Sequence, residues 1–166
     1  MQTSKTSKTS KTSKTSKTKF KRTLTIKMSE WLRQTPNTKG DSFLRRKSDG
    51  KKCCLGFECR ALGIVGISGL GDPAEVVNKL DSKEKQLDMV KKLGFLINKN
   101  QPKKRDAYGF GYDSFNYNDG TKIYYNSRDC NDLIKANDNQ SLSDWQKMQK
   151  IKSIFAKHKI KVKFVP

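Results

Sequence analysis

Residues 143–164 read SDWQKMQKIKSIFAKHKIKVKF, and within this stretch the hydrophobic period changes from that of a helix to that of a strand. The first part predicts an amphipathic helix, because apolar residues recur on one of its sides. These are Trp145, Met148, Ile151, Ile154 and Phe155. The last part alternates Ile160, Val162 and Phe164 with lysines, which is the pattern of a half-buried strand. We therefore expect an α+β fold.

Either Ser141 or Ser143 is placed to cap this closing helix, because a serine at the N-cap accepts a hydrogen bond from the first turn. The lysines of the helix are expected to lie largely outside, away from its apolar side. They are Lys147, Lys150, Lys152 and Lys157.

Capping residues place two helices in the middle of the chain. Asp72, Pro73 and Glu75 have the order of an N-cap, a first-turn proline and a capping-box acid, so a helix is predicted to start there. Ser82 marks a second start, followed by apolar residues at helical spacing and a closing glycine. These are Leu87, Val90, Leu93 and Gly94.

Two more helices are predicted nearer the N-terminus. Residues 26–34 include Trp31 and suit a short helix that Pro36 prevents from continuing. Residues 53–62 are largely apolar and end at Gly63, which predicts a buried helix with a glycine after its last turn.

Aromatic residues in 108–117 and 122–125 flank Asp119-Gly120, a strong signal for a β-hairpin. We therefore expect a small antiparallel sheet, formed by this hairpin and the C-terminal strand and packed by four or five short helices. The rings at positions 108, 110 and 112 would share one face of a strand. That face is either core, which the scarcity of aliphatic residues nearby favours, or a surface that stacks on bases.

The charge of the chain is concentrated at its two ends. Of 36 Lys and Arg against 16 Asp and Glu, residues 1–27 hold eight Lys and one Arg without an acid, and residues 145–166 hold seven Lys without an acid. The middle is nearly balanced. Such a field attracts polyanions, so nucleic acid, an anionic membrane surface or an acidic protein face are the natural partners.

Five Thr-Ser-Lys triplets fill residues 3–17, with neither apolar residues to bury nor a helical period. We interpret residues 1–27 as a basic arm that is disordered or extended, and residues 28–166 as one small α+β domain. The arm either orders on a partner, which we favour, or is a solubilising repeat. The residues expected to bind the polyanion or partner are Lys5, Lys8, Lys11, Lys14, Lys17, Lys19, Lys21, Arg22, Lys27, Lys157, Lys159, Lys161 and Lys163.

Residues 50–59 read GKKCCLGFEC and form the most unusual cluster of the chain. With Trp31 and Leu44-Arg45 upstream and Asn137-Asp138 before the last helix, this cluster resembles a family of small uncharacterised proteins of bacteriophages and large DNA viruses. That family has a C-C-L-G-x-x-C segment and a late N-D-x-G segment. The chain departs from the pattern at Asn139-Gln140, where the late glycine is missing, and in adding the basic arm. The resemblance implies a viral origin and no established activity.

The cysteines allow three interpretations. At a helix N-terminus beside lysines, Cys54 could be an activated nucleophile with His158, the only histidine, as its base. A zinc site would need Cys54, Cys59, Cys130 and His158 together, although the chain has no Cys-x-x-Cys pair. We favour reduced, buried thiols, because free cysteine is among the most buried residue types, and we expect neither a metal nor a cofactor.

Three remaining motifs have ordinary structural interpretations. The glycines of 63–71 lack the ending of a P-loop and suit a flexible linker. Asn137-Asp138-Asn139 lacks the glycine and glutamate of a calcium loop and suits a turn. Residues 102–105, Pro-Lys-Lys-Arg, are similar to a nuclear-import signal, and a solvated loop is favoured.

These observations together predict a non-enzymatic viral structural or interaction protein. We expect a virion or minor capsid component, located in the virion or the host cell interior and not secreted, whose arm binds an acidic protein face or the packaged genome. The alternative is a nucleic-acid-binding protein without sequence specificity that uses both basic ends. A third hypothesis is a Cys-dependent hydrolase or transferase. The chain has no apolar run long enough to span a membrane, and we expect no signal peptide because the N-terminal residues lack an apolar h-region.

Overall fold

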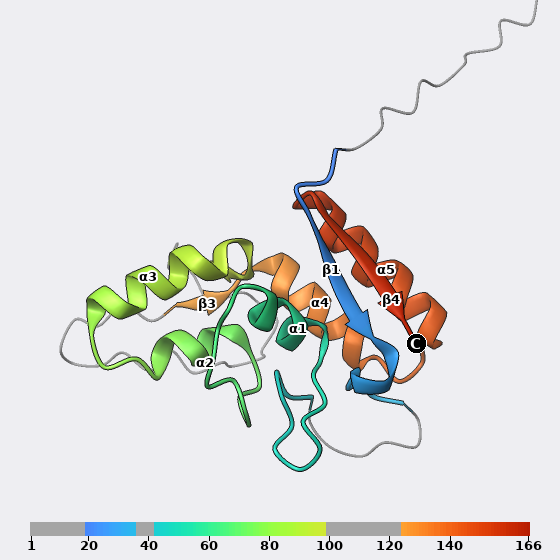
Figure 1. The fold of residues 1–166 in the computed structure, drawn as a ribbon, viewed down its shortest axis with the longest axis horizontal. Helices are drawn as coiled ribbons and strands as arrows, with labels where there is room; N and C mark the ends of the chain where they lie inside the picture. The colour runs from blue at the N-terminus through green and yellow to red at the C-terminus, as the bar shows by residue number, and fades with distance from the viewer. Residues whose placement is uncertain (1–18, 36–41, 99–123) are drawn as a thin grey trace, which may run out of the picture.

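A computed structural model describes residues 19–35, 42–98 and 124–166, and these have the expected α+β fold (Figure 1). The described residues contain two two-stranded sheets. They also contain five α-helices: α1 (Cys54–Ala61), α2 (Pro73–Asn78), α3 (Lys83–Leu93), α4 (Arg128–Asp138) and α5 (Asp144–Lys157). Short 3-10 turns follow β1, at Met28–Glu30, and α3, at Gly94–Leu96.

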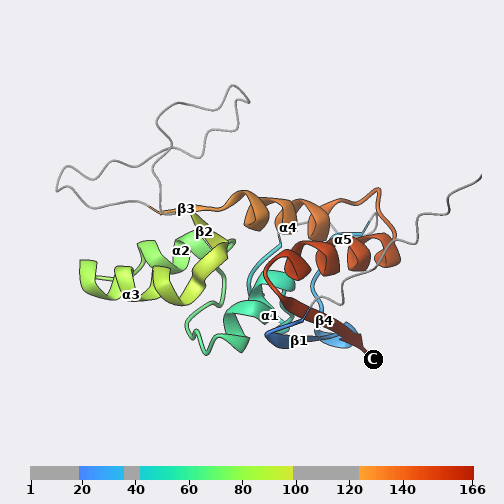
Figure 2. The ribbon, with the colours of Figure 1, turned by 90° about the horizontal axis from the view of Figure 1, so that it is seen from above.

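The larger sheet pairs the first strand of the described chain with the last. β1 (Arg22–Lys27) and β4 (Ile160–Val165) are parallel, with Arg22 opposite Ile160 and Lys27 opposite Val165. The alternating pattern of β4 is confirmed, but its partner is not the expected hairpin. The inner face of the sheet packs against α1 and α5, and α4 lies beyond them (Figure 2).

The prediction that the basic arm extends to residue 27 is wrong for residues 22–27. These form β1, in which Leu24 and Ile26 are 2% and 0% exposed and belong to the hydrophobic core. Thr23 and Thr25 alternate with them on the solvent side. The globular part therefore begins by Arg22, and the helix expected over 26–34 is replaced by the end of β1 and one 3-10 turn.

The smaller sheet pairs β2 (Ile97–Asn98) with β3 (Tyr125–Asn126) in antiparallel register. The hairpin expected between residues 108 and 125 lies almost wholly outside the described residues, as does the segment at 102–105. Tyr124, at the edge of that segment, is buried.

The capping signals are confirmed by the structure. The Asp72 side chain accepts a hydrogen bond from the Glu75 amide at 3.1 Å, with Pro73 in the first turn. Ser82 caps α3, and Ser143 rather than Ser141 caps α5 through a complete capping box. Gly63 follows α1 in the left-handed region at φ 69°, where a residue with a Cβ would be strained.

Two helix faces differ from the expected ones. On α5, Trp145 is 65% exposed, whereas Lys147 is fully buried and donates from Nζ to the carbonyl of Gln34. On α3, Leu87 is exposed and Gln86 is buried, with its Nε2 donating to the carbonyl of Leu80. In both helices, a polar side chain that donates to a backbone carbonyl lies inside, and a neighbouring apolar residue lies outside.

The glycine of the Cys-Cys-Leu-Gly segment is required by a close approach. Gly56 lies in α1, and a Cβ there would come 1.6 Å from the backbone oxygen of Leu44. The segment around Leu44 therefore packs directly on the helix, which only glycine permits. The glycine-rich segment 63–71 is likewise packed rather than a free linker, because Ile64, Ile67 and Leu70 are buried in the core.

Asn137 connects three parts of the core. It is buried near the end of α4 and does not lie in the expected turn. Its Oδ1 accepts from Trp31 Nε1 at 2.8 Å and from the Cys54 amide at 3.4 Å. Its Nδ2 group donates to the Leu32 carbonyl at 3.1 Å and to Ser42 Oγ at 3.0 Å. One side chain thus holds the segment after β1 and the start of α1 against α4.

We predict that Asn137→Ala lowers the free energy of unfolding by about 2 to 4 kcal/mol, because buried partners such as Trp31 Nε1 and the Leu32 carbonyl lose their hydrogen bonds. Urea denaturation followed by tryptophan fluorescence measures this change. Asn131→Ala, on the exposed side of the same helix, is the control and should change it by less than about 0.5 kcal/mol. Equal effects of the two substitutions would contradict the role of Asn137.

We also predict that a chain starting at Lys19 folds, whereas one starting at Met28 does not. The shorter chain loses Leu24 and Ile26 and uncovers Ile160 and Val162 on β4. Each buried aliphatic side chain contributes about 1.5 to 3 kcal/mol, against a total stability of about 5 to 15 kcal/mol. Near-ultraviolet circular dichroism and urea denaturation test this, and a cooperative transition for the chain starting at Met28 would refute it.

Candidate polyanion-binding surface

The parallel pairing of β1 and β4 joins the two basic ends of the sequence in one sheet. On its solvent face, Thr23 lies opposite Lys161 and Thr25 lies opposite Lys163. The Lys21 amide donates to the Lys159 carbonyl at 2.7 Å, which extends the contact beyond the strands. Segments far apart in the sequence therefore form one surface with lysines and threonine hydroxyls and no acid on either strand.

The lysines of this surface fall into two groups. In the first group, the lysine side chains are exposed and make no hydrogen bond or ion pair among the described contacts. These are Lys19, Lys21, Lys159, Lys161 and Lys163. They are available to an anionic partner, and we refer to this group as the basic sheet.

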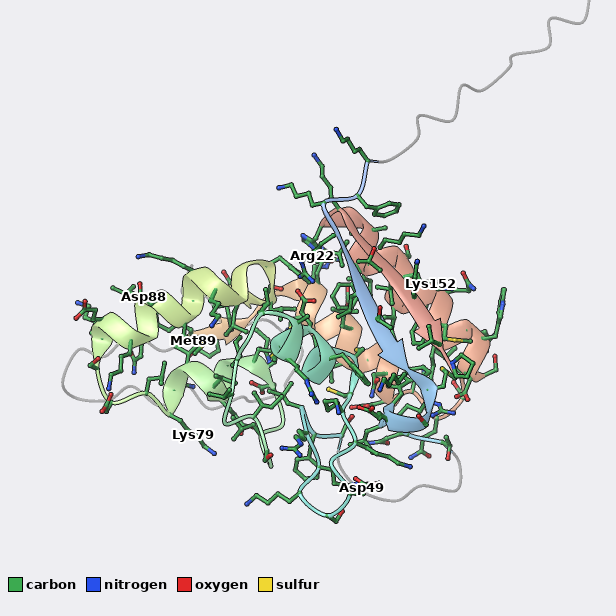
Figure 3. All side chains as sticks on the ribbon, in the orientation of Figure 1. Arg22, Asp49, Lys79, Asp88, Met89 and Lys152 are labelled. Carbon is green, nitrogen blue, oxygen red and sulfur yellow. The ribbon has the colours of Figure 1, made fainter. Side chains whose placement is uncertain are left out.

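The other described candidates already have acidic partners. Arg22 binds the buried carboxylate of Glu58, and Figure 3 shows Arg22 at the start of β1. Lys27 lies 3.3 Å from Glu30 and stays 60% exposed. Lys157 Nζ lies 2.9 Å from Asp129 Oδ1. Arg22 is therefore a structural residue at the base of the sheet rather than a free cation.

The remaining candidates lie where the structure gives no account of them. Residues 1–18 are outside the described residues, so the expected roles of the repeat lysines stay predictions. They are Lys5, Lys8, Lys11, Lys14 and Lys17. The same holds for the aromatic residues between 108 and 123.

An open groove of about 440 Å³ adjoins the basic sheet at the edge of β1 that faces away from β4. Phe57, Arg60 and Ala61 of α1 form part of its lining, together with the residues of β1. Arg60 is exposed there, whereas Lys52 is buried and its Nζ lies 2.8 Å from Glu30 Oε2. The groove therefore adds the exposed cation Arg60 to that side of the sheet, together with the partly exposed carboxylate of Glu30.

Lys159 has an unusual backbone conformation. It lies between α5 and β4 at φ 59°, and it is the only non-glycine residue with a positive φ in the described part of the chain. Glycine or asparagine is the usual choice at such a helix end, because a side chain there is strained. The sequence thus places a lysine beside Lys21 at a position where glycine would be less strained.

The cysteines lack the properties of a nucleophilic site. Cys53, Cys54, Cys59 and Cys130 are free and buried. Burial raises the pKa of Cys53 to about 12 and raises the pKa of Cys54 well above its ordinary value, so the helix N-terminus does not dominate. The Sγ of Cys54 contacts the carbonyl of Leu133 at 3.8 Å.

His158, the expected base, contacts groups other than Cys54. His158 Nε2 lies 2.8 Å from Asp129 Oδ2, and the imidazole stacks on Phe95 with ring centroids 3.9 Å apart. Hydrogen bonds from Lys157 and His158 hold the pKa of Asp129 below its ordinary value. Among the described residues, no hydrogen bond joins His158 to Cys54. Within residues 19–35, 42–98 and 124–166, no three His, Cys, Asp or Glu side chains are grouped to hold a metal ion.

Two features of this surface could have been found from the sequence. The run Arg-Thr-Leu-Thr-Ile-Lys at 22–27 has the two-residue alternation of a strand, which the assignment of residues 1–27 to the arm overlooked. Phe20, between Lys19 and Lys21, is 40% exposed and also went unnoticed. The partner of β1 has no comparable local signal.

No family model matches this chain, and neither a curated protein nor a solved structure does. The resemblance to the viral family therefore stays a prediction that rests on the cysteine segment. Among the described residues, no helix is both long and apolar enough to cross a membrane.

We predict that the thiols of the folded protein do not react with iodoacetamide at pH 8. With pKa values raised by burial, the reactive thiolate is a very small fraction of each thiol at this pH. Mass spectrometry after a short exposure should show no alkylation without denaturant and four alkylated cysteines in urea. Rapid alkylation of Cys53 or Cys54 in the folded protein would revive the thiol-enzyme hypothesis.

Proposed function

We propose that this protein is a non-enzymatic nucleic-acid-binding protein that contacts phosphates without reading base sequence. The observation that carries this proposal is the pairing of β1 with β4, which combines the two basic ends into the basic sheet. Five exposed lysines without an acidic partner in the described contacts gather there. A surface of this kind gains affinity from the release of counterions when it contacts a polyanion.

The type of cation supports binding without sequence specificity. Specific readout of base edges commonly uses arginine, whose planar group makes two hydrogen bonds at once, whereas lysine acts as a point charge. The cations of the basic sheet are all lysines; of the two arginines beside it, Arg22 is held by Glu58 and Arg60 lies in the adjoining groove. Thr23 and Thr25 add hydroxyl groups that can donate to phosphate oxygens.

We place this binding within a virion, where the protein would be a minor component attached to the packaged genome. The resemblance to viral proteins supports this setting, and the basic repeat at residues 3–17 supports a role in attachment. An acidic protein face is the other partner for the same charges. Threonines paired with a row of lysines suit phosphates as well as carboxylates, so competition is needed to separate the two.

We predict that affinity for duplex DNA falls steeply between 50 and 200 mM salt. Replacement of Lys5, Lys8, Lys11, Lys14 and Lys17 by Gln in the full chain should flatten the dependence of log K on log salt by up to about 4.5, since each lost phosphate contact removes about 0.9. Fluorescence anisotropy across a salt series measures both effects.

A charge-matched control replaces five lysines near α2 and α3 by Gln, at positions 79, 83, 85, 91 and 92. This variant should keep the salt dependence of the wild type. Affinity that is insensitive to salt, or the same loss in both variants, would refute the proposal. Equally tight binding of polyglutamate would favour an acidic protein as the partner.

A further inference from the structure

We infer that the basic sheet binds single-stranded nucleic acid, which lies along β4 with one base stacked on Phe20. This inference rests on the proposed function and adds the form of the ligand. It combines three features: a row of lysines on and just before β4, a partly exposed aromatic residue next to Lys21, which binds the start of that row, and a strained lysine where glycine would serve the fold better.

The row consists of two lysines on β4 and one in the turn before it. Lys161 and Lys163 both point to solvent from β4, and Lys159 is exposed just before the strand. Alternate residues of a strand are about 6.6 Å apart, which sets the spacing of Lys161 and Lys163 along β4. This period is comparable to the spacing of successive phosphates along an extended single strand. Successive phosphates along one strand of a duplex have a similar spacing, so the choice of a single strand rests on Phe20.

The hydroxyl groups beside this row reinforce the match. Thr23 and Thr25 are exposed and lie directly opposite Lys161 and Lys163 in the register of the sheet. A backbone that runs along β4 thus meets an ammonium group on one side and a hydroxyl group on the other at two successive positions. Both are donors to phosphate oxygens.

Phe20 offers an aromatic ring on which a base can stack, a contact that lysines bound to phosphates do not provide. It precedes β1, is 40% exposed and lies between Lys19 and Lys21. The backbone bond from Lys21 to Lys159 fixes this segment to the start of the lysine row. Aromatic rings beside basic tracks are the usual stacking sites for single strands, because unpaired bases expose their faces and bases within a duplex do not.

The backbone conformation of Lys159 is a separate observation that supports the same conclusion. Its left-handed backbone at φ 59° is unfavourable for a side chain, and it heads the row. Strained residues of this kind are concentrated at functional sites. The charge of Lys159 therefore matters for binding, and the fold itself would be at least as stable with glycine there.

The test compares three ligands of equal length with the full chain: a 20-nucleotide oligothymidine, an abasic strand with the same phosphates, and a 20-base-pair duplex. The wild type should bind oligothymidine most tightly. Phe20→Ala should weaken binding of oligothymidine about tenfold, which is the effect of losing one stacked base, and leave the abasic strand unaffected. Leu87→Ala, on α3 with the same 40% exposure, is the matched control and should change neither.

The lysine row has its own variants. Lys161→Gln with Lys163→Gln should reduce the salt slope for oligothymidine by about 1.4, or 0.7 for each phosphate contact, whereas Lys79→Gln with Lys83→Gln should leave it unchanged. Lys159→Gly should weaken binding without lowering the midpoint of urea unfolding. A merely structural role for Lys159 predicts unchanged binding.

The outcomes separate this inference from the proposed function. Equal affinity for oligothymidine and the abasic strand, together with no effect of Phe20→Ala, would overturn the stacked single strand and leave general nucleic-acid binding in place. Tighter binding to the duplex than to oligothymidine would also overturn the stacked single strand and leave general nucleic-acid binding in place. Failure to bind any of the three ligands at 50 mM salt would overturn both.

Discussion

The parallel pairing of β1 with β4 is the constraint on which the rest of this structure depends. It brings the start and the end of the described chain together, and every helix lies between them in sequence. The inner face of the pair, with Leu24, Ile26, Ile160 and Val162, closes the core over α1 and α5. Its outer face carries the charge. Because successive side chains of a strand point to opposite faces, each strand contributes apolar side chains to the core on one side and lysines or threonines to the solvent face on the other.

Buried polar groups fix how the parts around this sheet pack. Asn137 makes hydrogen bonds to Trp31, Leu32 and the start of α1. Lys147, on the buried side of α5, donates a hydrogen bond to the carbonyl of Gln34. Burial lowers the pKa of Lys147, which shows that the interior disfavours its charge. Groups of this kind tolerate few arrangements, because a buried donor or acceptor without a partner is costly. They favour one packing of the chain over other compact forms.

The base of the basic sheet depends on a charge pair whose carboxylate is buried. Glu58 on α1 is almost fully buried and holds Arg22, the first residue of β1, while its Oε2 has no hydrogen-bond partner among the described residues. Breaking such a pair is costly because the other charge is left buried alone. The pair thereby anchors the point at which the basic N-terminal segment joins the domain. Arg22 therefore has a structural role, and its guanidinium is paired with Glu58.

The sequence by itself determined what depends on near neighbours. Caps at Asp72, Ser82 and Ser143, the glycine after α1 and the alternation of β4 all follow from residues within a few positions of each other. The basic character of both ends was equally evident. Only the tertiary structure decided that these ends pair, that Asn137 is buried, and that Lys147 lies inside while Trp145 lies outside. Those outcomes depend on contacts such as Trp31 with Asn137 and Lys147 with Gln34, which are 106 and 113 residues apart, and local periodicity contains no information about partners at that distance.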